Sequence, residues 1–198
     1  MNRKPRPISP STSAKVRVFR TDPGCEVLGP GRRAVIWVQG CTLACKGCLV
    51  PRSWPAQGPE RSVAELADWI LQLPDIEGIT LSGGEPFQQA EALATLVTEV
   101  RRQRDLGVVC YTGYALADLA GKPLLDQIDL LIDGPYRQAE HADLLWRGSA
   151  NQRLHYLTGR YSPAPQDVGA GLEFRFDSDG RFAFAGVPPW PGYVQAMP

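Results

Sequence analysis

The chain has 198 residues, of which 43% are hydrophobic and 21% charged, proportions typical of one globular domain or one domain with a tail. Lys and Arg together number 21, as do Asp and Glu, so the net charge of zero favours neither nucleic acid nor an anionic membrane as a partner. No apolar run approaches the roughly 20 residues of a membrane-spanning helix. The N-terminus also lacks the apolar segment of a signal peptide. We therefore expect a cytoplasmic protein, in which cysteines are more often metal ligands or reactive groups than disulfides.

Three segments differ in composition. Residues 1–13 are rich in Pro, Ser and basic side chains and predict a disordered leader. Residues 14–158 are expected to form the main domain. Residues 159–198 form an extension that is rich in Pro, Gly and Ala at first and then alternates in polarity around DSDG, which predicts a β-hairpin from the segments 172–176 and 181–185. Two roles are open for this extension, namely covering a sheet edge or forming part of a docking surface.

Strands and helices are expected to alternate in the main domain. Apolar, β-branched runs predict buried strands at 33–38, 78–81, 108–111 and 128–132. Apolar residues at helical spacing predict a helix from a Ser62/Glu65 capping box up to Pro74, a second helix over 88–104, and a short helix ending at Ala120. This alternation predicts an α/β fold with a parallel sheet and right-handed crossovers.

Three loops follow predicted strands directly: a cysteine loop after residue 38, SGGEP at 82–86 and TGY at 112–114. In parallel sheets of this kind, ligands bind beyond the carboxyl ends of the strands. We therefore expect the three loops to share one rim of the sheet.

The cysteine loop places Cys41, Cys45 and Cys48 in the spacing C-x3-C-x2-C. Three thiolates in one short loop can bind three corners of an iron–sulfur cubane, because iron and thiolate sulfur are soft partners. The fourth iron then stays open for a small molecule that binds through amine and carboxylate groups.

A structural zinc site is the alternative, although zinc modules usually present two pairs of ligands and this loop presents a cluster of three. The candidates for a fourth zinc ligand are Cys25, Cys110, His141 and His155. We expect Cys110 to be a small buried strand residue and His155 to lie in a sheet.

The SGGEP segment suits an amino-acid-like cofactor, because its glycines allow close backbone approach and Glu85 can neutralise an amine or organise the loop. An ordinary strand-to-helix turn, with Glu85 near a helix N-terminus, is the alternative. Asp133, at the end of a predicted strand, is a candidate for a ribose or partner contact or a solvated carboxylate that caps a turn.

The cysteine spacing after one strand, followed by SGGEP after the next, resembles the radical S-adenosylmethionine superfamily. The resemblance implies a partial (βα)6 barrel in which Cys41, Cys45 and Cys48 hold a [4Fe-4S] cluster and S-adenosylmethionine occupies the open iron. Reductive cleavage of that cofactor then yields a radical that abstracts hydrogen. The residues that the resemblance places beside the cofactor are Gly47, Cys48, Leu49, Gly83, Gly84 and Glu85.

Four further motifs, at 29–33 (GPGRR), 111–114 (YTGY), 131–136 (LIDGPY) and 145–153 (LWRGSANQR), are similar to the small activating proteins of anaerobic ribonucleoside-triphosphate reductases, a branch of the glycyl-radical activases. The similarity implies that the hydrogen comes from a glycine of a large partner enzyme and that flavodoxin or ferredoxin supplies the electron. The last motif either grips the partner's glycine loop or closes the sheet edge, and the residues concerned are Trp146, Arg147, Asn151 and Gln152.

Two positions depart from the family pattern, since Leu49 stands where close relatives carry an aromatic residue and Leu28 where an acidic or amide residue is common. Two other functions remain open. One is a radical enzyme that modifies another protein, a peptide or a small metabolite. The other is a non-catalytic iron–sulfur or zinc-binding module.

Overall fold

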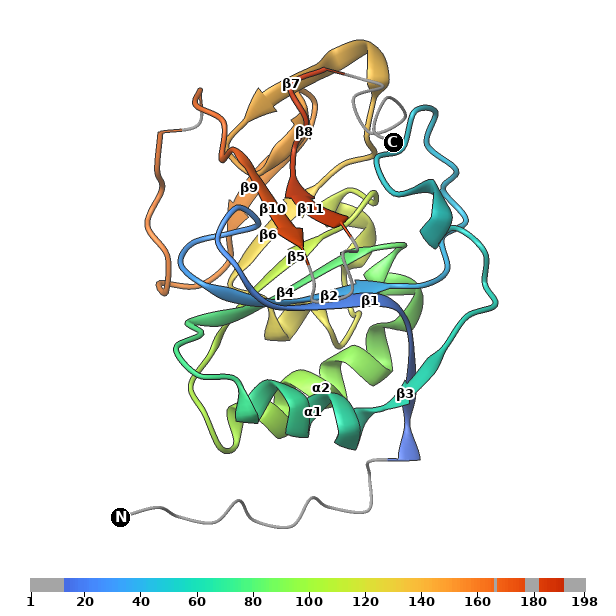
Figure 1. Cartoon of the computed structure of the whole chain (residues 1–198), viewed down its shortest axis with the longest axis vertical. Helices are drawn as coiled ribbons and strands as arrows, with labels where there is room; N and C mark the ends of the chain where they lie inside the picture. The colour runs from blue at the N-terminus through green and yellow to red at the C-terminus, as the bar shows by residue number, and fades with distance from the viewer. Residues whose placement is uncertain (1–12, 166, 177–181, 191–198) are drawn as a thin grey trace.

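The computed structural model describes residues 13–165, 167–176 and 182–190 (Figure 1). Nearly all of the expected leader, and the DSDG turn of the expected hairpin, lie outside these residues. The described chain has a mixed α/β fold built on a seven-stranded sheet in the order β3-β1-β2-β4-β5-β6-β9. Among the described helices, none is long and apolar enough to span a membrane.

The elements follow one another along the chain. The strands of the main sheet are β1 (Lys15–Cys25), β2 (Arg33–Val38), β3 (Glu60–Ser62), β4 (Gly78–Gly83), β5 (Gly107–Tyr111), β6 (Leu130–Asp133) and β9 (Arg153–Tyr156). Two-stranded sheets are formed by β7 (His141–Leu144) with β8 (Arg147–Ser149), and by β10 (Leu172–Phe176) with β11 (Phe182–Gly186). The α-helices are α1 (Val63–Gln72) and α2 (Ala90–Arg101).

The centre of the main sheet is parallel, as the sequence predicts. Strands β2, β4, β5 and β6 pair in parallel, in register from Arg33 opposite Gly78 onward. The flanks differ from the prediction, because β1 runs antiparallel to β2 and β9 runs antiparallel to β6. The described strands show no closure of the sheet into a barrel, since β3 and β9 end the strand order.

The helices cover one face of the sheet, and the β10–β11 hairpin lies on the other (Figure 1). Helix α1 begins at the predicted capping box, in which Glu65 N donates to Ser62 Oγ and Ser62 N donates to the Glu65 carboxylate. Helix α2 begins at Ala90, because residues 86–89 form a 3₁₀ turn first. The expected short helix is likewise a 3₁₀ turn, Leu116–Leu119.

Alternate residues of β2 face two different cores. Ala34, Ile36 and Val38 pack with α1 and α2 in the larger hydrophobic cluster. Val35 and Trp37 point to the opposite side, where they pack with Ala185 of β11. Because successive side chains of a strand point to opposite faces, β2 separates the helical core from the face that carries the hairpin.

A fully buried arginine fixes the amino-terminal ends of the central strands. Arg33 is 0% exposed, and burial lowers the pKa of its guanidinium. All five of its N–H donors are used, which is the full capacity of the group. The acceptors, at 2.7–2.9 Å, are Thr80 Oγ1, Tyr161 Oη and the carbonyl oxygens of Pro30, Ile79 and Gly107.

We predict that Arg33→Met lowers the free energy of unfolding by roughly 3 kcal/mol or more, because it leaves several buried acceptors without a donor. Urea denaturation checks this value. Arg32→Met is the matched control, since the neighbouring side chain is exposed, and we expect a change within about 0.5 kcal/mol. Equal losses in the two variants would contradict the structural role of Arg33.

Candidate functional site

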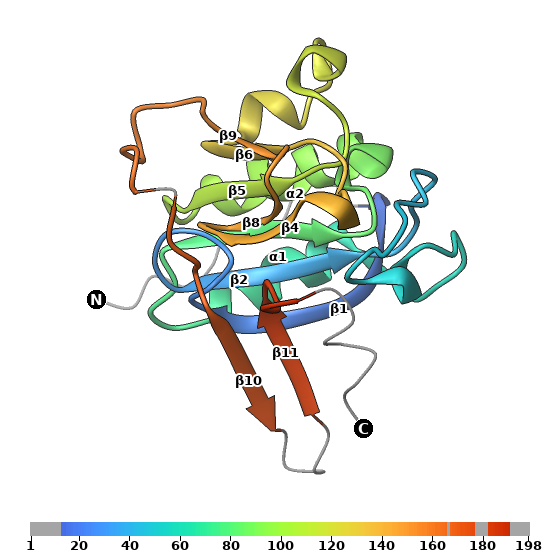
Figure 2. The same cartoon turned by 90° about the horizontal axis from the view of Figure 1, so that it is seen from above.

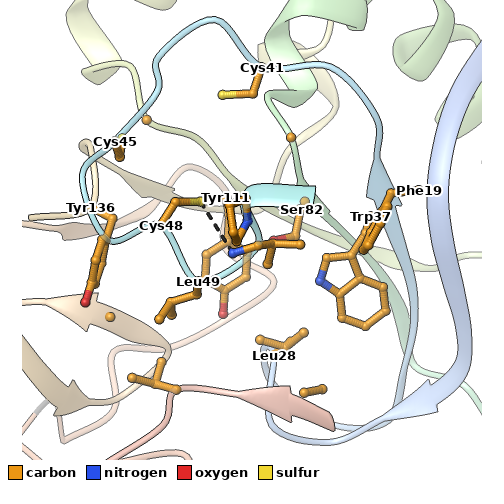
Figure 3. A pocket seen from close by; sticks show the side chains of 18 of the residues that line it. Phe19, Leu28, Trp37, Cys41, Cys45, Cys48, Leu49, Ser82, Tyr111 and Tyr136 are labelled. Atoms are coloured by element: carbon orange, nitrogen blue, oxygen red, sulfur yellow. Dashed lines mark hydrogen bonds between the residues drawn. The ribbon is translucent and has the colours of Figure 1, made fainter. Parts of the chain in front are cut away.

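One cavity of about 470 Å³ lies at the carboxyl ends of the central strands. Its lining includes the cysteine loop after β2, the SGGEP loop after β4 and the TGY loop after β5. This confirms the prediction that the three loops share one rim of the sheet. Figure 3 shows the cysteines along one side of this cavity, with Trp37 and Leu28 farther along it.

All three loop cysteines line the cavity, and each is half-buried. The remaining cysteines do not line it. Cys25 and Cys110 are fully buried in β1 and β5, where burial raises the pKa of the Cys25 thiol to about 12. The structure therefore keeps these two thiols apart from the loop, as the sequence predicts for Cys110.

The histidines that could complete a zinc site are engaged elsewhere. His141 lies within 2.9 Å of Tyr136 Oη and 2.8 Å of the Pro188 carbonyl oxygen. His155 lies in β9, as expected, and its Nε2 is 3.0 Å from Asp133. Neither histidine lines the cavity. The zinc alternative therefore has no fourth ligand from the four candidates.

The fit of the cysteine loop to a cluster rests on its donor chemistry. Within the described residues, no three His, Cys, Asp or Glu side chains converge on a single-ion site. The three thiols instead lie at separate points around one space (Figure 3). Thiolates are the usual ligands of a [4Fe-4S] cluster, and three thiols facing a common, largely apolar cavity match that requirement.

Local backbone geometry shapes the cysteine loop. Gly47, between the second and third cysteines, has a φ of +73°, which favours glycine. Cys48 N donates to the Cys45 carbonyl oxygen, which closes a tight turn. At the start of the loop, Cys41 N donates to the Trp54 carbonyl oxygen. Burial raises the pKa of the Cys41 and Cys45 thiols, so a metal that displaces their protons competes with protonation.

Glu85 connects the three loops of the rim. Its carboxylate is 1% exposed and accepts hydrogen bonds from Phe87 N at 3.0 Å, Thr112 Oγ1 at 2.8 Å and Gly113 N at 2.9 Å. Its own N–H donates to the Gly40 carbonyl oxygen at 2.9 Å, just before the cysteines. Burial raises the pKa of Glu85, and the three hydrogen bonds oppose that shift. Of the two roles expected for this carboxylate, these contacts match organisation of the loop.

The two glycines of SGGEP are required by backbone packing. A Cβ on Gly83, whose φ is +94°, would lie 2.7 Å from Trp37 Cα. A Cβ on Gly84 would lie 2.3 Å from the Gly40 carbonyl oxygen. Both glycines therefore let β4 and its loop pass close to β2 and the cysteine loop. This packing requires glycine at both positions independently of any cofactor contact.

Sequence reasoning missed much of the cavity wall opposite the cysteines. Trp37 and Tyr111 line the cavity from β2 and β5, and the Arg20 guanidinium lies 3.9 Å from the centre of the Trp37 ring. Burial raises the pKa of Tyr111, whose hydroxyl has no hydrogen-bond partner among the described residues. Residues 182–187, from β11 onward, complete the wall. The sequences of β2 and β5 are apolar on both faces of the strand, so their pattern does not indicate which side chains face a ligand.

The predicted partner-binding residues divide into two groups. Trp146 and Gln152 line the cavity, as Leu49 and Cys48 do. Gln152 also accepts from Gly148 N at 2.9 Å and donates to the Gly134 carbonyl oxygen at 3.1 Å.

The other two predicted residues also take part in local hydrogen bonds. Asn151 donates to the Pro135 carbonyl oxygen at 2.9 Å, and Arg147 donates to the Gln152 carbonyl oxygen at 3.4 Å. Asn151 and Gln152 thus join the segment to the loop after β6, while both expected roles, closing the sheet edge and gripping a partner, stay predictions.

The expectation of a solvated carboxylate at Asp133 is wrong in one respect. The side chain does cap a turn, since it accepts from Leu116 N at 2.7 Å. It is buried, however, and faces His155. The hydrogen bond from Leu116 N partly compensates for the loss of water around the carboxylate.

Comparison with known proteins identifies the class first. Residues 27–155 match the family model described as a 4Fe-4S single cluster domain, which spans the cysteine loop and the main sheet from β2 to β9. The chain therefore belongs to the class of iron–sulfur proteins with a single cluster domain.

Curated relatives then define the family more narrowly. A protein of Vibrio cholerae is 40% identical over 144 residues, covering 67% of this chain and 92% of the relative. One of Enterobacteria phage T4 is 38% identical over 135 residues (65% and 86%), and one of Escherichia coli K12 is 35% identical over 144 residues (66% and 92%). All three are named anaerobic ribonucleoside-triphosphate reductase-activating protein, and this chain belongs to their family. The resemblance seen in the sequence is thereby confirmed.

We predict that Glu85→Ala lowers the free energy of unfolding by roughly 2–4 kcal/mol, because two buried N–H groups and a hydroxyl lose their acceptor. It should also lower the iron bound per chain after anaerobic reconstitution, since the loop after β5 loses its hydrogen bonds to the residue that contacts the start of the cysteine loop. Urea denaturation and iron analysis measure the two effects. Glu91→Ala, at an exposed site in the first turn of α2, is the control and should cost less than about 1 kcal/mol. Indistinguishable variants would exclude the role given to Glu85.

Proposed function

We propose that this protein is a radical S-adenosylmethionine enzyme that generates a glycyl radical on an anaerobic ribonucleoside-triphosphate reductase. The observation that carries the proposal is the separation of the cysteines: Cys41, Cys45 and Cys48 face one cavity, while the other two thiols are buried in strands. Membership of a family whose curated members are named as activating proteins of that reductase supports the choice of partner.

The chain's own residues have distinct tasks in this proposal. Cys41, Cys45 and Cys48 would hold three irons of a [4Fe-4S] cluster and leave the fourth for S-adenosylmethionine. When bound, the pair would supply a one-electron reductive cleavage of the cofactor, with the electron from an external donor, and the radical so released would take a hydrogen atom from a glycine Cα. Gly83, Gly84 and Glu85, with the backbone of Gly47 and Leu49, would border the cofactor.

The cavity suits this chemistry because its walls are largely apolar. Trp37 and Leu28 line the part away from the cysteines, and Tyr111 lines the cavity near Cys48 (Figure 3). An apolar wall excludes water and offers few polar groups that would divert a reactive species from its target. The buried Glu85 keeps the rim loops in one arrangement and so fixes the cavity before any ligand binds.

The proposed reaction also involves the central strands and an electron donor. The parallel strands β2, β4, β5 and β6 would represent an open part of a (βα)6 radical enzyme barrel. Flavodoxin or ferredoxin would deliver the electron. A cytoplasmic location, where such donors and the reductase are found together, stays a prediction.

We predict that Cys45→Ala abolishes the cluster absorbance at about 400 nm after anaerobic reconstitution. It should also abolish release of 5'-deoxyadenosine with dithionite, because the cluster loses one of three ligands. Cys110→Ala is the matched control, since its thiol is buried outside the cavity, and it should keep both signals. Full turnover by the Cys45 variant would refute the proposal, and cleavage without any glycyl radical on the reductase would refute the choice of partner.

A further inference from the structure

The β10–β11 hairpin has two faces of different character. Its strands pair in register, with Phe174 opposite Phe184 and Phe176 opposite Phe182. Directly opposed residues and residues two apart share a face, so these four phenylalanines lie together. The other face carries Glu173, Arg175, Ala183 and Ala185.

Polar contacts attach the hairpin to β1 and to the residue that follows it. Arg175 Nε lies 3.0 Å from Asp22, and Glu26 N donates to the Glu173 carboxylate at 2.9 Å. Arg20, which covers Trp37, also donates to the Phe184 carbonyl oxygen at 2.6 Å. The hairpin therefore has a defined position against the main sheet.

Apolar contacts reinforce that position at the cavity. Ala185 is buried against Leu28, Val35 and Trp37, and residues 182–187 line the cavity. Residues of β11 are thus part of the wall, including Phe182 and Phe184 of the phenylalanine face.

The phenylalanine face is exposed to an unusual degree for such large apolar side chains. Phe174, Phe176 and Phe182 are 44%, 74% and 41% exposed. The Phe174 ring stacks on the Phe182 ring with centroids 5.6 Å apart, and the Phe176 ring packs against Phe182 at a tilt of 47° with centroids 5.2 Å apart. We call these three residues the hairpin patch. Exposed clusters of aromatic side chains are typical of protein interaction sites.

Three features place the hairpin patch where an incoming protein would arrive. Figure 2 shows β10 and β11 projecting away from the main sheet, with the end of β10 and the start of β11 at the outer end of the hairpin. Phe182 belongs to the hairpin patch and also lines the cavity. The hairpin lies outside residues 27–155, which match the family model.

We propose that the hairpin patch is the docking surface for the protein whose glycine enters the cavity, and that it binds an apolar segment of that partner. This inference rests on the proposed function, because a radical enzyme that acts on a protein must hold that protein beside its cavity. A second copy of this chain fits less well, because an aromatic-to-aromatic pairing of two hairpins would cover Phe182 at the cavity wall of both copies and hinder entry.

The test is the double variant Phe174→Ser/Phe176→Ser, since neither residue lines the cavity. We expect cluster absorbance and dithionite-driven release of 5'-deoxyadenosine to stay as in the wild type. The Kd for the anaerobic reductase of the same organism should rise at least about tenfold, because exposed aromatic anchors dominate such interfaces. Glycyl-radical yield, followed by electron paramagnetic resonance, should fall at low reductase concentration and recover at high concentration.

Val168→Ser is the matched control, since Val168 is 53% exposed but lies outside the hairpin patch, and it should leave the Kd unchanged. An unchanged Kd in the double variant would overturn the docking proposal, as would loss of cofactor cleavage without the reductase. So would a change confined to self-association in sedimentation velocity. Failure of the wild-type protein to cleave S-adenosylmethionine would instead overturn the proposed function, which distinguishes the two.

Discussion

The arrangement of the site depends on one buried carboxylate. Glu85 joins the loops after β2, β4 and β5 through three accepted hydrogen bonds and one donated by its backbone. Taking a carboxylate out of water costs several kcal/mol, and charge-assisted hydrogen bonds to backbone N–H groups offset that cost only when several are present together. The three donors come from two different loops, so the carboxylate is satisfied only when both loops are in place. The burial of Glu85 therefore requires the same arrangement of the loops that forms the rim.

At the opposite, amino-terminal ends of the same strands, a buried cation has the equivalent role. Arg33 satisfies all five donors with acceptors from β4, from the start of β5 and from the loops around them. Arg33 and Glu85 thus fix the two ends of the parallel core without forming an ion pair with each other. Between them, the alternation of β2 directs Ile36 toward the helices and Trp37 toward the cavity. A rigid sheet between two fixed ends is a suitable frame for a cavity that must exist before its ligand arrives.

The sequence predicts the parallel strands, the capping box of α1 and the shared rim, because each depends on local patterns of polarity or on strand order. It does not predict β1, since Asp22, Pro23 and Gly24 resemble a turn although the strand continues through them with a register shift. The sequence does not predict the antiparallel direction of the flanking strands either, because strand direction depends on long-range connections. The roles of Trp37 and Tyr111 are hidden too, since they follow from which face of an entirely apolar strand meets the cavity. The hairpin is predicted from its alternation, but its place against Trp37 depends on contacts such as that between Arg20 and Phe184.

The division between the matched domain and the hairpin suggests that the chemistry and the recognition of the partner are carried by different parts of the chain. Every candidate cluster ligand and every predicted cofactor contact lies within residues 27–155. The hairpin adds no titratable group to the cavity from residues 182–187, only backbone and apolar side chains. Its contribution to the chemistry is therefore limited to shape and to the exclusion of water. Phe174 and Phe176 are less constrained, because neither lines the cavity and both reach it only through their ring contacts with Phe182. An element built this way can adapt to a different partner while the chemistry of the domain behind it stays the same, which is the physical advantage of adding recognition as a separate hairpin.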